Sequence, residues 1–229
     1  MEKIVVVGGG ISGLSTGILA QRQGYQTVVL EKNNMVGGEC TGWNRKGHHI
    51  DNCIHWLIGC KIEDALHGLW NELGVLASDV DIYHEPVFYS LHTDDATLAF
   101  DRDLEKSRAE FLSIAPEDAQ EINLFFDSVR QAECIQPPCE KSPAHMNVLE
   151  MAKMAMSMKG AAKTYQMYGN ITIAELAQRF QHPLVKLMMS AFFPEDFLAI
   201  TLLTSYAFYK SGSAGIRNNI DLSEQYSVM

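Results

Sequence analysis

The sequence predicts an α/β fold in which a parallel βαβ unit at the N-terminus precedes a mixed, mainly helical α+β region. Three patterns lead to this prediction. A β-branched run meets a glycine-rich turn, a helical pattern and a second apolar run follow that turn, and most of the remaining chain shows helical spacing with one hairpin pattern. The chain has 229 residues, of which 47% are hydrophobic and 20% charged, which suits one large domain or two small ones and is enough to bury a core.

The first elements form a recognisable series. Residues 4–7 are apolar and β-branched, which predicts a strand buried on both faces. A glycine turn in the spacing Gly-x-Gly-x-x-Gly follows, then a helix that Gly24 ends, then a second buried strand over 27–30. That strand runs into Glu31, which stands 18 residues after the last glycine of the turn. Together these features predict a Rossmann-like, dinucleotide-binding unit.

Each residue of the turn has a physical role in such a unit. Gly8 permits the tight turn, Gly10 lets backbone N–H groups approach a pyrophosphate, and Gly13 lets the helix pack close to the strand. Ile11 and Ser12 open the helix, whose unpaired N–H groups and partial positive charge favour phosphate.

The residues after the second strand extend this site. Glu31 can accept hydrogen bonds from the hydroxyls of an adenosine ribose and would repel a 2′-phosphate. Lys32 follows it, and the pair Gly37–Gly38 with Glu39 comes shortly after, where bare backbone can lie beside a long cofactor.

A family resemblance rests on these residues and on the segment 42–59. The acid followed closely by Gly37 and Gly38 resembles the FAD-binding signature of the amine oxidase and phytoene desaturase superfamily. The segment 42–59, which contains Asp51 and the run His55-Trp56-Leu57, is similar to the phytoene dehydrogenase-related group, which includes carotenoid desaturases and isomerases.

The resemblance implies FAD as the cofactor and places His55 near its isoalloxazine ring. It also implies a flavin-dependent oxidoreductase that desaturates, isomerises or oxidises an apolar substrate, such as a carotenoid or another isoprenoid, by hydride transfer to FAD. The chain departs from many relatives by carrying Val36 and Glu39 where they have cationic residues, and Cys53 where they have glycine, which indicates a divergent subgroup.

The predicted domains are a FAD-binding domain over 1–76, a substrate-covering domain over 77–210 and an irregular tail over 211–229. The second domain is expected to begin with a hairpin of strands 87–91 and 97–100. Helices are expected over 62–73 as core packing and, beyond the hairpin, over 103–114, 116–135 and 146–165, from Thr172, from Pro183, and from Pro194 to Tyr209.

Two interpretations stay open for a cluster of methionines in the predicted helix 146–165. They are Met146, Met151, Met154, Met156 and Met158. Methionine can fill gaps in an ordinary helical core, or it can form a pliable surface for a lipid-like substrate or a membrane edge.

Composition excludes several classes of function. The net charge of −10 without a basic run argues against nucleic-acid binding. The five cysteines form no Cys-x-x-Cys pair, which predicts reduced thiols in a cytoplasmic protein. The longest apolar stretch is 13 residues, too short for a transmembrane helix, so only peripheral membrane contact stays open. His48, His49 and His55 lack metal-ligand spacing, and neither a metal site nor a catalytic residue is predicted.

The last segment raises a further hypothesis. The polar sequence after residue 216 does not continue the pattern of the resembled group, which suggests a product truncated by a frameshift near residue 217 and an incomplete sheet. Two alternatives to the flavoenzyme therefore stand: a catalytically inactive fragment that binds FAD or a nucleotide, and an NAD-dependent dehydrogenase in which Glu31 binds the cofactor ribose.

Overall fold

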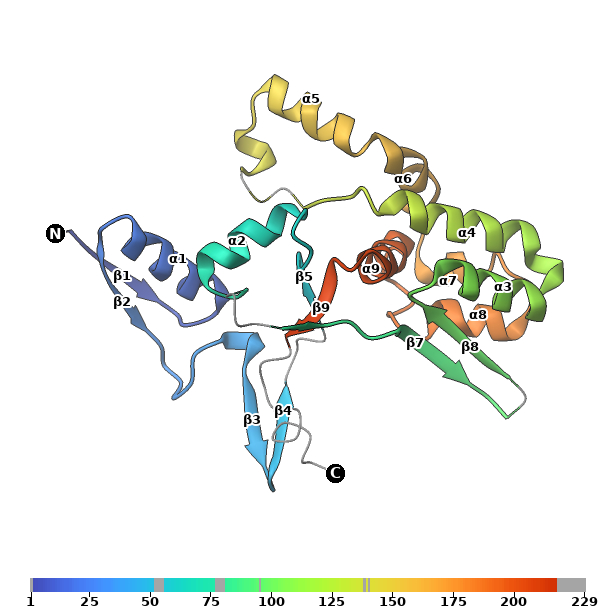
Figure 1. The fold of residues 1–229 in the computed structure, drawn as a ribbon, viewed down its shortest axis with the longest axis horizontal. Coiled ribbons are helices and arrows are strands. Elements are labelled where there is room, and N and C mark those ends of the chain that lie inside the picture. The colour runs from blue at the N-terminus through green and yellow to red at the C-terminus, as the bar shows by residue number, and fades with distance from the viewer. Residues whose placement is uncertain are drawn as a thin grey trace. The chain divides into compact units, whose positions relative to one another are not determined.

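The computed structural model describes residues 2–51, 56–76, 81–94, 96–137, 139 and 141–217, which fall into two compact units (Figure 1). The first unit comprises Met1–Leu57, His67–Tyr83 and Ile216–Met229, and the second comprises Ile58–Leu66 and His84–Gly215. The domain limits near residues 76 and 210 stay predictions.

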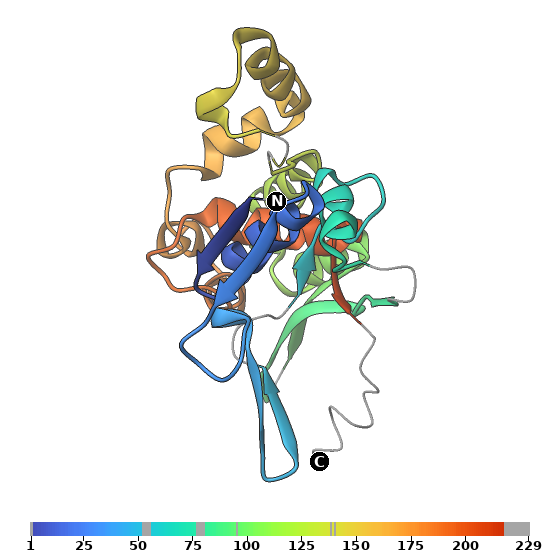
Figure 2. The same ribbon diagram turned by 90° about the vertical axis from the view of Figure 1, so that its left-hand side faces the viewer.

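The first unit contains the predicted parallel βαβ unit. Strand β1 (Lys3–Val7) leads into helix α1 (Ile11–Arg22), and strand β2 (Gln26–Leu30) lies parallel to β1 with Val7 opposite Leu30 (Figure 2). Gly24, at φ +90°, follows the end of α1 as the sequence predicts.

The prediction that these strands are buried on both faces is wrong. Helix α1 packs on the face that carries Val6 and Val29, close enough that a Cβ on Gly17 would lie 3.1 Å from Val29 Cγ2. The alternate face carries Val5 and Val7, and the Val7 side chain is 85% exposed. Helix α1 covers one face of these two strands, so the continuous apolar run does not mean that both faces are buried.

The first unit also contains a β-hairpin that the sequence analysis did not identify. Strands β3 (Gly42–Arg45) and β4 (His48–Asp51) are antiparallel and joined by Lys46 and Gly47. Both turn residues have positive φ, +53° and +82°, which is the backbone that a two-residue hairpin turn requires.

Four further short elements come from separate segments of the chain. They are strand β5 (Leu57–Ile58), helix α2 (Ala65–Leu73), strand β6 (Ile82–Tyr83) and strand β9 (Ala214–Arg217). Helix α2 starts later than predicted. Its apolar residues Leu66, Leu69, Trp70 and Leu73 are half-buried, whereas Ile62 before the helix is 80% exposed, so the expected core packing of this stripe is wrong for Ile62. Strand β9 pairs antiparallel with β6, so the beginning of the predicted irregular tail is a strand.

The second unit is mainly helical, with the predicted hairpin at its start. Its elements are β7 (Val87–His92), β8 (Thr97–Asp101), α3 (Leu104–Ile114), α4 (Ala119–Ala132), α5 (Val148–Ser157), α6 (Ala162–Tyr168), α7 (Ile173–Ala177), α8 (Pro183–Ser190) and α9 (Ala199–Ser211). The antiparallel pairing of β7 and β8 confirms the hairpin.

The core of the second unit is aromatic and centres on Phe100 of β8. The Phe100 side chain is fully buried, and its ring centroid lies 4.7 Å from that of Tyr206 on α9 and 5.2 Å from that of Phe111 on α3. The Tyr206 hydroxyl donates to the Asp101 carbonyl at 2.6 Å, so its one polar atom is satisfied inside this core.

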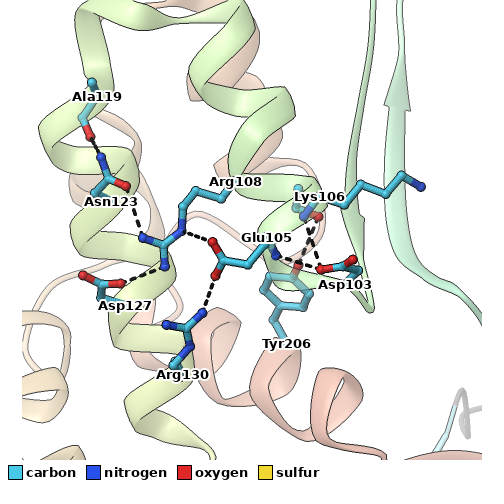
Figure 3. Close-up of polar contacts among 10 residues, drawn as sticks. Asp103, Glu105, Lys106, Arg108, Ala119, Asn123, Asp127, Arg130 and Tyr206 are labelled. Atoms are coloured by element: carbon cyan, nitrogen blue, oxygen red, sulfur yellow. Dashed lines mark hydrogen bonds and ion pairs between the residues drawn. The ribbon is translucent and has the colours of Figure 1, made fainter.

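Helices α3 and α4 are joined by a network of ionic contacts at their surface. Figure 3 shows Arg108 of α3 between Glu105 on the same helix and Asp127 on α4, with Arg130 on the other side of Glu105. The Arg108 Nη2 to Asp127 Oδ1 distance is 2.7 Å. The Arg108 side chain is 15% exposed, whereas Glu105, Asp127 and Arg130 are more than half exposed, so the pair between Glu105 and Arg130 contributes little to stability.

Two further predicted helices differ clearly from the structure. The chain over 146–165 is broken into α5, a 3₁₀ turn at Lys159–Ala161 and α6. The last helix begins at Ala199 rather than Pro194. The backbone around its start forms hydrogen bonds to residues before α7 and at its first position. The Phe197 carbonyl accepts from the Ile173 N–H, and the Ala199 N–H donates to the Ile171 carbonyl. Tertiary hydrogen bonds thus decide where this helix starts.

Candidate dinucleotide-binding site

The turn between β1 and α1 has a conformation that glycine provides. Gly8 has φ +106°, and its N–H donates to the Leu30 carbonyl at 2.7 Å, which ties the turn to the end of β2. A Cβ on Gly13 would lie 1.9 Å from the Gly8 carbonyl oxygen. No larger residue fits at Gly13 unless α1 moves away from the strand.

The second glycine pair lies against this turn. The Gly37 N–H donates to the Gly9 carbonyl at 2.7 Å, and Gly10 and Gly37 form an isolated parallel bridge. A Cβ on Gly38 would lie 3.1 Å from Gly10 Cα. Two glycine segments far apart in the sequence therefore form one surface of bare backbone.

Glu31 supports the turn through its carboxylate. Its Oε1 accepts from the Asn33 N–H at 2.9 Å, and its Oε2 accepts from the Gly9 N–H at 2.6 Å. These backbone donors, Asn33 first and Gly9 second, lower the pKa of Glu31 below its ordinary value of 4.5. The carboxylate is therefore ionised at neutral pH, at the end of β2 where a ribose acid is expected.

The start of α1 offers donors to an anion. Gly10 caps the helix without a side-chain hydrogen bond, and the first turn contains no acidic residue. Helix N-termini present N–H groups that lack intrahelical partners and carry partial positive charge.

A depression of about 430 Å³ opens at this helix start. Its wall is formed by Val7, Gly8, Gly10, Ile11, Ser12, Gly13, Gly37, Glu39 and Cys40. Backbone from both glycine segments therefore faces the same space as the first turn of α1, which is the arrangement that binds a pyrophosphate. Glu39 places one acidic residue on this wall.

The structure brings most of the predicted site residues together. Gly8, Gly10, Ile11, Ser12, Gly13, Gly37 and Glu39 line the depression, Gly38 touches Gly10, and Glu31 bonds to the turn. Lys32 is exposed and does not line it. His55 lies outside the described residues, so its predicted place near the flavin stays a prediction.

Sequence reasoning missed three participants, of which Val7 lines the depression at the end of β1. Gly9 is an unspecified position of the glycine motif, yet it donates to Glu31 and accepts from Gly37. Cys40 lines the depression, and its sequence context gives no signal for that position. Over the part of the chain that the structure describes, no group of three or more His, Cys, Asp or Glu residues is placed to hold a metal ion.

This backbone fits a dinucleotide. An added Cβ would lie 1.9 Å from backbone at Gly13 and 3.1 Å from backbone at Gly38, where the glycine segments and α1 lie against one another. The fold and this geometry define a Rossmann-like dinucleotide-binding domain, and residues 6–73 match the family described as NAD(P)-binding Rossmann-like domain.

The N-terminal part of the chain is also homologous to oxidoreductases of the phytoene and carotenoid desaturase group. A phytoene desaturase of Fusarium fujikuroi is 26% identical over 110 residues, which are 47% of this chain and 19% of that protein. A 1-hydroxycarotenoid 3,4-desaturase of a Flavobacterium species is 33% identical over 82 residues, which are 36% of this chain and 15% of that protein.

A solved structure supports the fold over most of the chain. The crystal structure of an oxidoreductase from Methanosarcina mazei aligns with a TM-score of 0.50 and 17% identity, over 95% of this chain and 45% of that one. In each of these comparisons the aligned region is less than half of the other protein.

Replacing Glu31 with glutamine is expected to weaken dinucleotide binding on the order of tenfold, because an amide cannot accept from both backbone N–H groups. The stability that the ionised Glu31 carboxylate adds to the folded turn is fully present above the ordinary carboxyl pKa. It is lost as the pH falls through the lowered pKa of Glu31 in the folded protein, and dinucleotide binding is expected to weaken over the same range. Titration of the cofactor at neutral pH and at acidic pH measures both effects. Glu72→Gln is the matched control and is not expected to weaken binding, since Glu72 is exposed and does not line the depression. Equal losses in both variants would contradict the role of Glu31.

Proposed function

We propose that this chain forms the FAD-binding part of an oxidoreductase that desaturates or isomerises an apolar, isoprenoid-type substrate. FAD, when bound, supplies the chemistry by accepting a hydride from the substrate, which gives up a proton as well when a double bond forms. The relationship to phytoene and carotenoid desaturases supports the reaction class and the apolar substrate.

The observation that carries the choice of FAD is the second glycine pair. Gly37 and Gly38 lie directly against Gly9 and Gly10, so the bare backbone surface continues beyond the βαβ turn. A long dinucleotide such as FAD needs such a continued surface. Glu31 would hold the adenosine ribose, the start of α1 the pyrophosphate, and Gly37 and Gly38 the chain beyond it.

An NAD-dependent dehydrogenase is the second candidate, and the matched NAD(P)-binding domain description favours it. The acid at Glu31 disfavours a 2′-phosphate, so NAD rather than NADP is the nucleotide to test.

The proposal also covers the cellular location of the protein and its contact with a membrane. A cytoplasmic location is supported by Cys134 and Cys139, which are free thiols. The described residues contain no helix long and apolar enough to cross a membrane. Peripheral contact with a membrane belongs to the proposal because an apolar substrate concentrates in lipid.

The visible absorption spectrum of the purified chain, with and without added FAD, tests the cofactor. We expect a bound-flavin spectrum that survives desalting, and we expect NAD to leave that spectrum unchanged. A protein that binds NAD but takes up no FAD would support the second candidate, and one that binds neither would contradict both.

Thiol labelling tests the location of the bound cofactor. Cys40 lines the depression, whereas Cys134 lies in the second unit and is half-buried. FAD is expected to slow alkylation of Cys40 by a maleimide and to leave Cys134 unchanged, as read by mass spectrometry of the peptides. Cys60 is a poor reporter because burial raises the pKa of its thiol to about 11. Equal labelling of Cys40 with and without FAD would place the cofactor elsewhere.

A further inference from the structure

Helix α5 presents an apolar surface to solvent. None of its residues is buried, and the side chains of Val148, Leu149 and Met156 are 85%, 66% and 75% exposed. The interpretation of the methionine cluster as ordinary helical core is therefore wrong for Met151 and Met156, which are both exposed. In Figure 1, α5 extends away from α4 and α9, the helices that line the core of the second unit.

The helix forms for local reasons rather than through burial. Asn147 and Glu150 make a capping box, with the Asn147 side chain accepting from the Glu150 N–H and the Glu150 carboxylate accepting from the Asn147 N–H. Lys141 Nζ lies 3.0 Å from Glu150 Oε2 and supports the same carboxylate. The apolar side chains of α5 are thus held in a fixed helical arrangement while they remain in contact with water.

Those side chains share a face. Val148, Ala152 and Met156 follow one another at intervals of four residues, and Leu149 lies two turns before Met156, so all four project from one side of the helix. This side and its immediate neighbours form what we call the α5 surface: Val148, Leu149, Met151, Ala152, Ala155 and Met156. Methionine side chains adapt to irregular partners such as acyl chains.

The charges around the α5 surface are unlike those of the rest of the protein. Lys153, Lys159 and Lys163 are exposed on α5 and just beyond it, and Lys141 precedes it, whereas Glu150 is the one acidic residue from 141 to 168. The whole chain has a net charge of −10. Exposed lysines on and just beyond a helix with exposed apolar side chains fit an anionic, apolar partner, as in helices that lie in a lipid interface.

We propose that α5 is a membrane-docking helix, whose apolar surface enters the interface of an anionic lipid layer while Lys153, Lys159 and Lys163 contact the headgroups. This inference deepens the membrane contact of the proposed function, but its evidence is the surface of α5 and not the nucleotide site. Under this proposal, an apolar substrate reaches the protein from the lipid layer at the second unit, which contains α5.

Co-sedimentation of the full chain with vesicles tests the proposal. We expect binding to phosphatidylcholine vesicles that contain phosphatidylglycerol, weaker binding to phosphatidylcholine alone, and a decrease with added salt. Leu149→Glu/Met156→Glu is expected to abolish this binding. Lys153→Gln and Lys159→Gln are each expected to lower the partition constant about fivefold. Ile62→Glu is the matched control, since Ile62 is 80% exposed but lies outside α5.

Hydrogen exchange keeps the test independent of variant folding. In the unmodified protein, vesicles with phosphatidylglycerol are expected to slow exchange of the α5 amides over 151–157 and to leave β1 and β2 unchanged. Absence of vesicle binding, or binding that persists in Leu149→Glu/Met156→Glu, would overturn the proposal. A concentration-dependent dimer that this double variant disrupts would assign the surface to a second copy instead.

Measuring flavin absorbance in the same samples separates the two proposals. Protein that binds FAD but not vesicles contradicts the role of α5 alone. Protein that binds vesicles but not FAD contradicts the proposed cofactor and leaves the α5 surface in place.

Discussion

Replacing Gly13 with alanine is expected to weaken FAD binding on the order of a hundredfold while the second unit stays folded. The added Cβ would lie 1.9 Å from the Gly8 carbonyl oxygen and 3.3 Å from Val6 Cγ1. The first of these neighbours is backbone, so the strain cannot be relieved by a side-chain rotation, and α1 must move away from β1. That movement also shifts the N–H groups at the start of α1.

The strain in Gly13→Ala is expected to cost about 1–3 kcal/mol. When the conformation that binds FAD carries about 3 kcal/mol of this strain, FAD binds on the order of a hundredfold more weakly. Flavin titration measures the loss, and far-ultraviolet circular dichroism checks that the helices of the second unit persist.

Gly68→Ala provides the matched control for this substitution. Gly68 lies in α2, and a Cβ added there would meet nothing within 4 Å. Alanine is the better helix former, so this variant is expected to bind FAD normally and to be slightly more stable. Unchanged FAD binding in Gly13→Ala would show that the cofactor does not use the turn between β1 and α1.

Replacing Phe100 with alanine is expected to destabilise the second unit by about 3–5 kcal/mol. Its ring is fully buried and lies within 5.7 Å, centroid to centroid, of the rings of Tyr206, Phe111 and Phe125. Truncation would leave a cavity among rings that come from three different helices and cannot collapse together. This loss is about a third to a half of the unfolding free energy of an average domain, which is about 10 kcal/mol.

Urea denaturation followed by circular dichroism measures this effect. Phe197→Ala is the control, because the Phe197 side chain is 46% exposed and its removal is expected to cost less than a third as much. A Phe100→Ala variant as stable as the unmodified protein would contradict the position of the aromatic core.

The predictions from sequence succeeded where the signal is local. The β1–α1–β2 unit is set by an apolar run, a glycine motif and a terminal acid, all within the first 31 residues. The capping box at Thr172 likewise gave the start of α7 correctly, because its hydrogen bonds to Glu175 lie within one turn of helix.

Features that depend on distant partners were not predictable in this way. The contact of Gly37 with Gly9 needs a hydrogen bond across the loop that follows β2. The start of α9 at Ala199 depends on backbone bonds to Ile171 and Ile173, which local spacing does not reveal. The exposure of α5 was also beyond the sequence, since its apolar spacing is the same whether the partner is protein or lipid.

The bare-backbone contact between the two glycine segments has a consequence for how this site tolerates change. Gly8, Gly9, Gly10, Gly37 and Gly38 contribute carbonyls, N–H groups and φ values rather than side chains. Val36 contributes no atom to the hydrogen bond between Gly37 and Gly9, and the Glu31 carboxylate, which accepts from the Gly9 N–H, is the one side chain described here that holds this contact. Such a protein can share few side chains with a relative and keep the same nucleotide-binding site, because main-chain geometry forms most of that site.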